Sequence, residues 1–130
     1  MIVVDASIVL AWFLEGGGTY DAALAYAGEN GACVPGNFHS EIAHALVRAE
    51  RRTRISPTDS TRILAEILEL PLTTELPDPH LVLSVAREHG LTGYDATYLS
   101  LAMESKFPLA TADATLRAAA AKLDLLWTGS

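Results

Sequence analysis

The stretch Ile2-Val3-Val4-Asp5-Ala6-Ser7 decides the fold, together with its later counterpart Leu109-Ala110-Thr111-Ala112-Asp113. In each stretch a short apolar run typical of a buried strand is followed by an aspartate, and good helix formers come next. A strand followed directly by a helix is the unit from which parallel sheets are built, because parallel strands need a crossover connection. The two stretches therefore predict an α/β fold with aspartates at strand ends.

The rest of the chain continues this alternation of strands and helices. Strands are predicted at residues 2–4, 32–34, 70–74, 108–111 and 125–127, and helices at 6–14, 20–27, 37–52, 57–68, 80–89, 94–106 and 114–122. The pattern predicts a three-layer α/β/α fold, with a mostly parallel sheet of four or five strands flanked by about seven helices. With 130 residues, half of them hydrophobic, the chain has the size of a single domain, residues 1–130.

Four carboxylates fall where such a fold gathers its functional groups. Asp5 and Asp113 follow strands, and the functional crevice of a parallel sheet lies at the carboxyl ends of its strands. Asp95 lies at the start of one helix and Glu41 in the first turns of another, so both can reach the same edge. Taken singly, each aspartate is equally explained as a helix N-cap, and Glu41 as a solvated residue favoured by the helix dipole.

The surroundings of these acids indicate a metal site. Apart from Arg117, no lysine or arginine lies near Asp5, Asp95 or Asp113 in the sequence. Carboxylates among apolar residues repel one another unless a cation neutralises them. Oxygen ligands suit Mg²⁺ or Mn²⁺, which can activate water and stabilise the leaving oxygen in phosphodiester hydrolysis. The pattern therefore predicts a metal-dependent nuclease.

The net charge of −7 argues against this prediction, because affinity for nucleic acids normally comes from clustered lysine and arginine. One or two divalent cations, each carrying a charge of +2, would change the total to about −5 or −3. The local distribution of charge then matters more than the total.

Four motifs, in this order, resemble those of the PIN-domain ribonucleases, and within them the VapC-type toxins of toxin–antitoxin pairs. The motifs are Val3-Val4-Asp5-Ala6-Ser7, Ser40-Glu41-Ile42-Ala43-His44-Ala45-Leu46, Leu91-Thr92-Gly93-Tyr94-Asp95-Ala96-Thr97-Tyr98 and Leu109-Ala110-Thr111-Ala112-Asp113. The resemblance implies an endoribonuclease that cuts RNA, commonly tRNA or ribosomal RNA, with a metal-activated water.

The resemblance also assigns residues and partners. It implies that Asp5, Glu41, Asp95 and Asp113 are catalytic and hold Mg²⁺ or Mn²⁺. Ser7 and Thr111 resemble the hydroxyls that support the acids in that family, although both are also explained as capping or core hydroxyls. A homodimer is expected, and a cognate VapB-type antitoxin would block the site.

Arginines on the 37–52 helix could supply the local positive charge for nucleic-acid binding that the net charge of the whole chain does not indicate. Steps of seven and eleven residues place Arg48 and Arg52 on nearly the same side as Glu41. We interpret them as contacts for the RNA backbone, whereas the structural alternative is a solvated helix end favoured by the dipole.

Other functions stay open at this point. They are a housekeeping PIN nuclease, an aspartyl-phosphate phosphatase or receiver domain, and a non-catalytic metal-binding module. The opening run Ile2-Val3-Val4 lacks a basic start and is followed by Asp5, so neither a signal peptide nor a membrane span is expected, and the cytoplasm is the expected location.

Overall fold

The computed structural model describes residues 1–16 and 20–129. Its sheet has four strands in the order β3-β2-β1-β4, and every neighbouring pair is parallel. The strands are β1 (Ile2–Val4), β2 (Ala32–Pro35), β3 (Leu72–Glu75) and β4 (Leu109–Ala110). The predicted parallel α/β sheet is therefore confirmed, and the strand that carries the first motif lies inside it, between β2 and β4.

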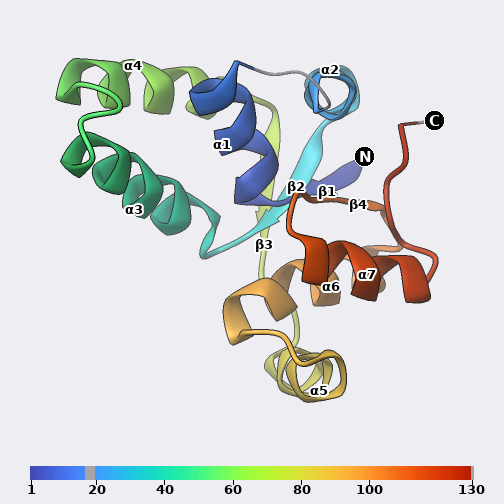
Figure 1. Cartoon of the computed structure of the whole chain (residues 1–130). Helices are drawn as coiled ribbons and strands as arrows, with labels where there is room; N and C mark the ends of the chain where they lie inside the picture. The colour runs from blue at the N-terminus through green and yellow to red at the C-terminus, as the bar shows by residue number, and fades with distance from the viewer. Residues whose placement is uncertain (17–19, 130) are drawn as a thin grey trace.

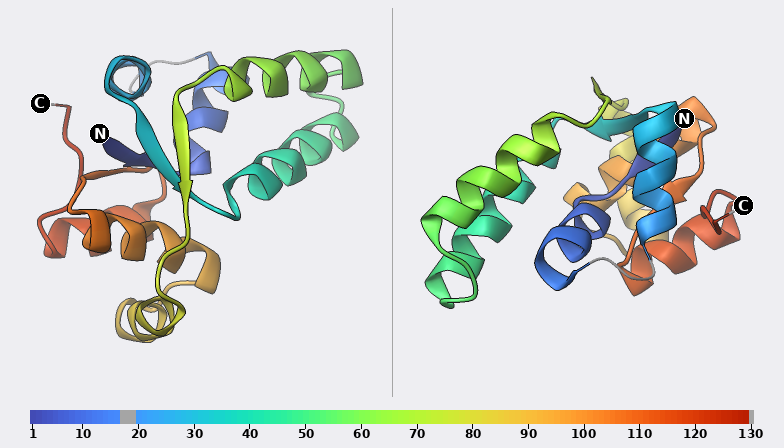
Figure 2. Two further views of the ribbon diagram at one scale, coloured as in Figure 1. Left: turned by 180° about the vertical axis from the view of Figure 1, so that it is seen from behind. Right: turned by 90° about the horizontal axis from the view of Figure 1, so that it is seen from above.

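Helices cover both faces of this sheet (Figure 1). Within the described residues they are α1 (Ala6–Glu15), α2 (Asp21–Asn30), α3 (Phe38–Arg51), α4 (Pro57–Leu68), α5 (Pro79–His89), α6 (Gly93–Ser105) and α7 (Ala114–Lys122). Helices α1 and α2 lie on one side of the sheet, and α5, α6 and α7 on the other. The pair α3 and α4 projects to one side of the molecule, as both views in Figure 2 also show.

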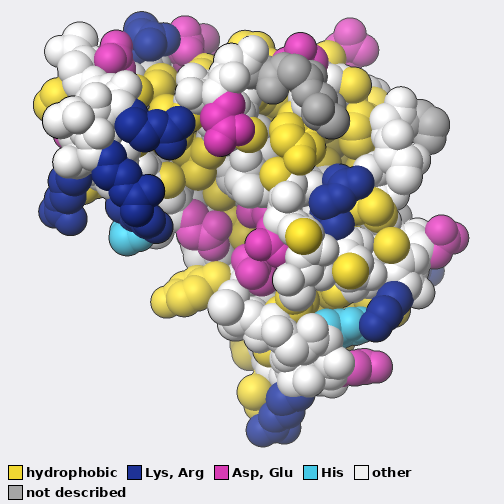
Figure 3. All heavy atoms as spheres, in the orientation of Figure 1, with side chains coloured by type: hydrophobic (Ala, Val, Ile, Leu, Met, Phe, Trp, Pro, Cys, Tyr) yellow, Lys and Arg dark blue, Asp and Glu magenta, His cyan; other side chains and the backbone are white. Residues whose placement is uncertain are grey.

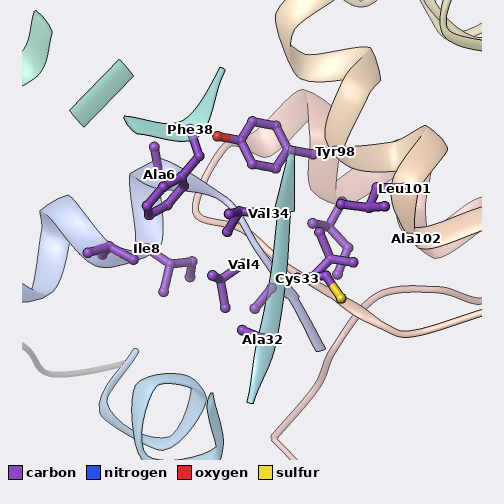
Figure 4. Close-up of a cluster of buried hydrophobic side chains, with 14 of the residues drawn as sticks. Val4, Ala6, Ile8, Ala32, Cys33, Val34, Phe38, Tyr98, Leu101 and Ala102 are labelled. Atoms are coloured by element: carbon purple, nitrogen blue, oxygen red, sulfur yellow. The ribbon is translucent and has the colours of Figure 1, made fainter. Parts of the chain in front are cut away.

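The core forms where the central strands meet α1 and α6. All three residues of β1 are buried, because this strand has neighbours at both edges and helices over both faces. Figure 4 shows Tyr98 reaching from α6 past β2 towards Phe38 at the start of α3, and both side chains are fully buried. Cys33 is also buried there, as a small core residue. The core therefore fixes the start of α3 and the helix α6 relative to one another.

The predicted strand at 125–127 is wrong in extent. Only Leu126 forms a β-bridge, to Leu109, and two backbone hydrogen bonds accompany it: Leu109 N–H donates to Leu125 O, and Trp127 N–H donates to Leu109 O. Strand β4 has only two residues, and Asp124 turns the chain with a φ of 57° just before the bridge. This leaves no length over which a fifth strand could pair.

One glycine-containing boundary also differs from expectation, and a second agrees with it. Helix α2 continues through Gly28 and ends before Gly31, which has a φ of 80°. Helix α1 ends as predicted at Gly16, a left-handed cap with a φ of 83°, while Gly17 and Gly18 lie outside the described residues. Within the described residues, no helix has the length and apolar character needed to cross a membrane.

Candidate active site

Asp5 is the most enclosed of the four acids, with 4 % of its surface exposed. It follows β1 in an extended conformation and caps α1, because its Oδ1 accepts a hydrogen bond from the Ser7 backbone N–H at 3.3 Å. Its Oδ2 accepts two more, from Ser7 Oγ at 2.8 Å and from Thr111 Oγ1 at 2.6 Å. Asp5 therefore caps α1 with one carboxylate oxygen and binds two hydroxyls with the other. Its role as a cap does not exclude a functional role.

Ser7 and Thr111 connect Asp5 to the loop that carries Asp113. Thr111 Oγ1 accepts a hydrogen bond from the Asp113 backbone N–H at 3.1 Å, and Ser7 Oγ accepts one from the Ala112 backbone N–H, also at 3.1 Å. Each hydroxyl thus donates to Asp5 and accepts from the loop after β4. The two strand ends are joined by side chains as well as by the sheet.

Asp113 is exposed and caps α7, since its Oδ1 accepts a hydrogen bond from the Leu116 backbone N–H at 2.8 Å. The nearby Arg117 does not neutralise it. The Arg117 guanidinium instead donates to the Thr111 carbonyl oxygen at 3.1 Å. Asp113 therefore keeps one carboxylate oxygen clear of the cap bond on the open side of the cluster.

Glu41, in the first turn of α3, is held by two side chains that the sequence analysis did not assign to the site. The Asn37 amide donates to Glu41 Oε1, and the Tyr98 hydroxyl donates to Oε2 at 3.1 Å. Asn37 occupies the cap position of α3 as expected, but its side chain binds Glu41 instead of the backbone. The spacing of four residues between Asn37 and Glu41 is a signal for this contact, because such residues are neighbours on a helix.

Asp95 lies in the first turn of α6 and is half-buried. The alternative explanation of Asp95 as the cap of this helix does not hold, because Thr92 is the cap and accepts a hydrogen bond from the Asp95 backbone N–H at 3.1 Å. The helix begins at Gly93, which puts Asp95 at its third position, three residues after the cap. Asp95 is therefore a first-turn residue of α6 and not its cap.

The four acids influence one another electrostatically. Burial raises the pKa of Asp5, Glu41 and Asp95, and the charges of neighbouring acids raise each further. The added effect comes from Asp113 on Asp5, from Asp5 and Asp95 on Glu41, and from Asp5 and Asp113 on Asp95. Four elements distant in sequence therefore bring their carboxylates within range of one another, and Figure 3 shows acidic side chains gathered in the hollow of this face.

Among the residues that the structure describes, no lysine or arginine forms an ion pair with these acids. In the described part of the chain, the lysine and arginine ion pairs are those of Arg62 with Asp59 and Glu66, outside the cluster. Hard oxygen donors without a counter-charge fit the chemistry of Mg²⁺ or Mn²⁺. As the side chains of residues 1–16 and 20–129 are placed, however, no three Asp, Glu, His or Cys residues are arranged to hold an ion.

Two adjoining cavities lie along one side of α3. The first, of about 470 Å³, contains two of the acids and is lined by Asn37, Ser40, Glu41, His44, Tyr94 and Asp95. The second, of about 230 Å³, contains the predicted arginines and is lined by Leu14, His44, Ala45, Arg48, Ala49, Arg52 and Arg54. His44 lines both cavities, so the basic face of α3 continues directly from the acidic one, as the grouping of basic side chains in Figure 3 illustrates.

Comparison with known proteins gives concordant matches. The PIN domain profile matches residues 2–122. The chain is 37 % identical over 117 residues to VapC ribonuclease Mb0985 of Mycobacterium bovis and to ribonuclease VapC9 of Mycobacterium tuberculosis, covering 89 % of this chain and 88 % of each relative.

Solved structures show the same architecture. The crystal structure of PAE2754 from Pyrobaculum aerophilum superposes with a TM-score of 0.73 and 30 % identity, covering 91 % of this chain and 78 % of that one. The structure of Mycobacterium tuberculosis VapC20, described as a toxin that cleaves the sarcin-ricin loop, superposes with a TM-score of 0.61. Its identity is 15 %, over 92 % of this chain and 95 % of that one, so it shows a shared fold.

Proposed function

This chain belongs to the PIN-domain family, and on that premise we propose that it is a VapC-type endoribonuclease, the toxin of a toxin–antitoxin pair. The observation that carries the proposal is the convergence of Asp5, Glu41, Asp95 and Asp113 in a chain 37 % identical to VapC ribonucleases. An acidic cluster without cationic partners suits the hydrolysis of a phosphodiester bond with divalent metal.

The four acids would hold Mg²⁺ or Mn²⁺ between them. When bound, the ion supplies an activated water and neutralises charge on the phosphate. The protein's own part is to orient the carboxylates. Ser7 and Thr111 fix the direction of Asp5, and Asn37 and Tyr98 fix both oxygens of Glu41.

The RNA backbone would lie along α3, where Arg48 and Arg52 line the cavity next to the acids. Exposed arginines contribute a salt-dependent affinity, because phosphate binding releases counterions. Replacing both with glutamine should lower RNA affinity and reduce the slope of log affinity against log salt by about 0.7 for each lost contact. Unchanged affinity and slope would contradict this assignment.

The remaining expectations belong to the same proposal. The substrate would be tRNA or ribosomal RNA, the protein would form a homodimer, and a VapB-type antitoxin would cover the acids. The protein would encounter the RNA and the antitoxin in the cytoplasm. Co-purification with the product of a short neighbouring gene would favour the toxin over a housekeeping PIN nuclease.

The decisive experiment is RNA cleavage by protein freed of any antitoxin, with Mg²⁺ or Mn²⁺ and with EDTA. Asp113→Asn is the sharpest variant, because asparagine caps a helix as well as aspartate does and the fold should persist. Asp5→Asn tests the enclosed acid, and Asp21→Asn, an exposed position in the first turn of α2, is the matched control.

We expect cleavage by wild type and the control, and none in EDTA or with either site variant. Cleavage that persists in EDTA would refute the metal mechanism. Metal binding by wild type without cleavage of any RNA would instead support a non-catalytic metal-binding module.

A further inference from the structure

Tyr94 has an unusual place beside the acids. Its side chain is 68 % exposed, and it lines the same 470 Å³ cavity as Glu41 and Asp95. Among the described residues, the other strongly exposed large hydrophobic side chains line other surfaces. They are Met1, Trp12, Val47, Leu68, Leu76, Leu83 and Leu123. An exposed aromatic ring at the rim of a cavity that contains two carboxylates offers an apolar face next to the acids.

The backbone of Tyr94 is tied to the network that holds Glu41. Thr97 Oγ1 lies 2.5 Å from the Tyr94 carbonyl oxygen and 3.1 Å from Asn37 Oδ1. Asn37 in turn donates to Glu41. Tyr94 also directly precedes Asp95 in the first turn of α6. The backbone position that carries the ring is therefore tied to the network around Glu41 and lies next to Asp95.

We propose that the ring of Tyr94 stacks on a nucleobase next to the phosphodiester bond that is cut. This inference rests on the proposed ribonuclease function and names a further substrate-binding residue for it. A strand whose phosphate enters the acidic cavity must place a neighbouring base near its rim. Base–aromatic stacking accepts every base, because each has a π-face.

Stacking at this position selects the form of the RNA. A base inside a duplex keeps its faces covered by its neighbours, whereas an unpaired base can be splayed out onto an aromatic side chain. Tyr94 would therefore favour single-stranded or looped RNA over a duplex. It would also supply affinity that does not depend on charge, at a place where the acids repel the phosphates.

The test measures binding of a fluorescent single-stranded oligoadenylate by anisotropy, in Mg²⁺, with the Asp113→Asn variant as the non-cutting background. Tyr94→Ala and Tyr94→Phe are added to it, and Leu83→Ala, an exposed position on α5 outside the cavity, is the matched control. We expect roughly tenfold or greater loss of affinity for Tyr94→Ala, and retention within about twofold for Tyr94→Phe and Leu83→Ala.

A second readout separates stacking from charge. Tyr94→Ala should leave the slope of log affinity against log salt unchanged, whereas the arginine variants should lower it. Equal affinity for Tyr94→Ala and its background would overturn the inference. An equal loss for Tyr94→Phe would also overturn it, because the hydroxyl and not the ring face would then be responsible.

The remaining outcomes distinguish this inference from the function on which it rests. If wild type cleaves RNA and Tyr94→Ala binds it normally but changes the oligomeric state in light scattering, the ring is a protein contact and stacking is refuted. If wild type neither binds nor cleaves RNA, the proposed function fails and the inference fails with it.

Discussion

Replacing Thr111 with valine should lower the stability of the folded protein through its effect on Asp5. Thr111 is fully buried, its hydroxyl donates to Asp5 Oδ2 at 2.6 Å, and it accepts from the Asp113 backbone N–H at 3.1 Å. Valine has the same shape but no hydroxyl, so packing is kept while both hydrogen bonds are lost. The enclosed Asp5 carboxylate would keep only the two bonds from Ser7.

The size of the effect follows from the charge on Asp5. A hydrogen bond to a charged group contributes about 1.5–3 kcal/mol, and the Asp113 N–H can turn to water because it is only partly buried. We therefore expect the free energy of unfolding to fall by about 2 kcal/mol at pH 8. The loss also raises the pKa of Asp5 further, so the penalty must shrink as the pH falls and Asp5 becomes protonated.

Urea denaturation in EDTA at pH 8 and at pH 4 measures both predictions. Thr111→Ser is the control, because it keeps the hydroxyl and loses one methyl group, at a cost of about 1 kcal/mol that does not depend on pH. A penalty for Thr111→Val below about 0.5 kcal/mol at pH 8, or the same penalty at both pH values, would refute the role given to this hydroxyl.

Three further predictions follow from other parts of the structure. Without metal, the melting temperature should rise as the pH falls from 8 towards 4, because the pKa values of Asp5, Glu41 and Asp95 are raised in the folded state and protonation then favours folding. A melting temperature that falls over this range in calorimetry would contradict this prediction. Tyr98→Phe should weaken Mg²⁺ binding roughly tenfold in calorimetric titration, because Glu41 Oε2 loses its hydrogen-bond donor. An unchanged midpoint would argue against a positioning role for Tyr98. Ser56→Ala should lower the free energy of unfolding in urea by about 1 kcal/mol, because it breaks the capping box of α4. RNA cleavage should stay the same. Reduced cleavage would mean that α4 does more than support α3.

Strand ends are the part of this site that sequence predicts well. An aspartate directly after a short buried strand has a known direction relative to the sheet, so the placement of Asp5 and Asp113 at one edge follows from local patterns. The terminal strand could not be predicted equally well, because its length depends on β4 having only two residues. Local propensity contains no information about the length of a partner strand.

One of the two supports of Glu41 lies beyond local patterns. Tyr98 contacts Glu41 across 57 positions of sequence, and no pattern in the sequence near either residue predicts that contact. Asn37 carries the signal of a helix cap, yet its amide binds Glu41 because the carboxylate competes for it. Sequence patterns therefore predict which acids meet, and the folded structure adds which neutral side chains orient them.

The hydrogen bond from Thr111 to Asp5 spans 106 positions of sequence, and this separation determines when the surroundings of Asp5 can be completed. During synthesis at about 5–20 residues per second, Thr111 follows Asp5 out of the ribosome by roughly 5 to 20 s. Throughout that interval β1 lacks β4 as its neighbour, and Asp5 has only Ser7 as a donor. A growing chain therefore lacks both Thr111 and Asp113, and cannot complete the acidic cluster, until nearly all of the fold has been translated.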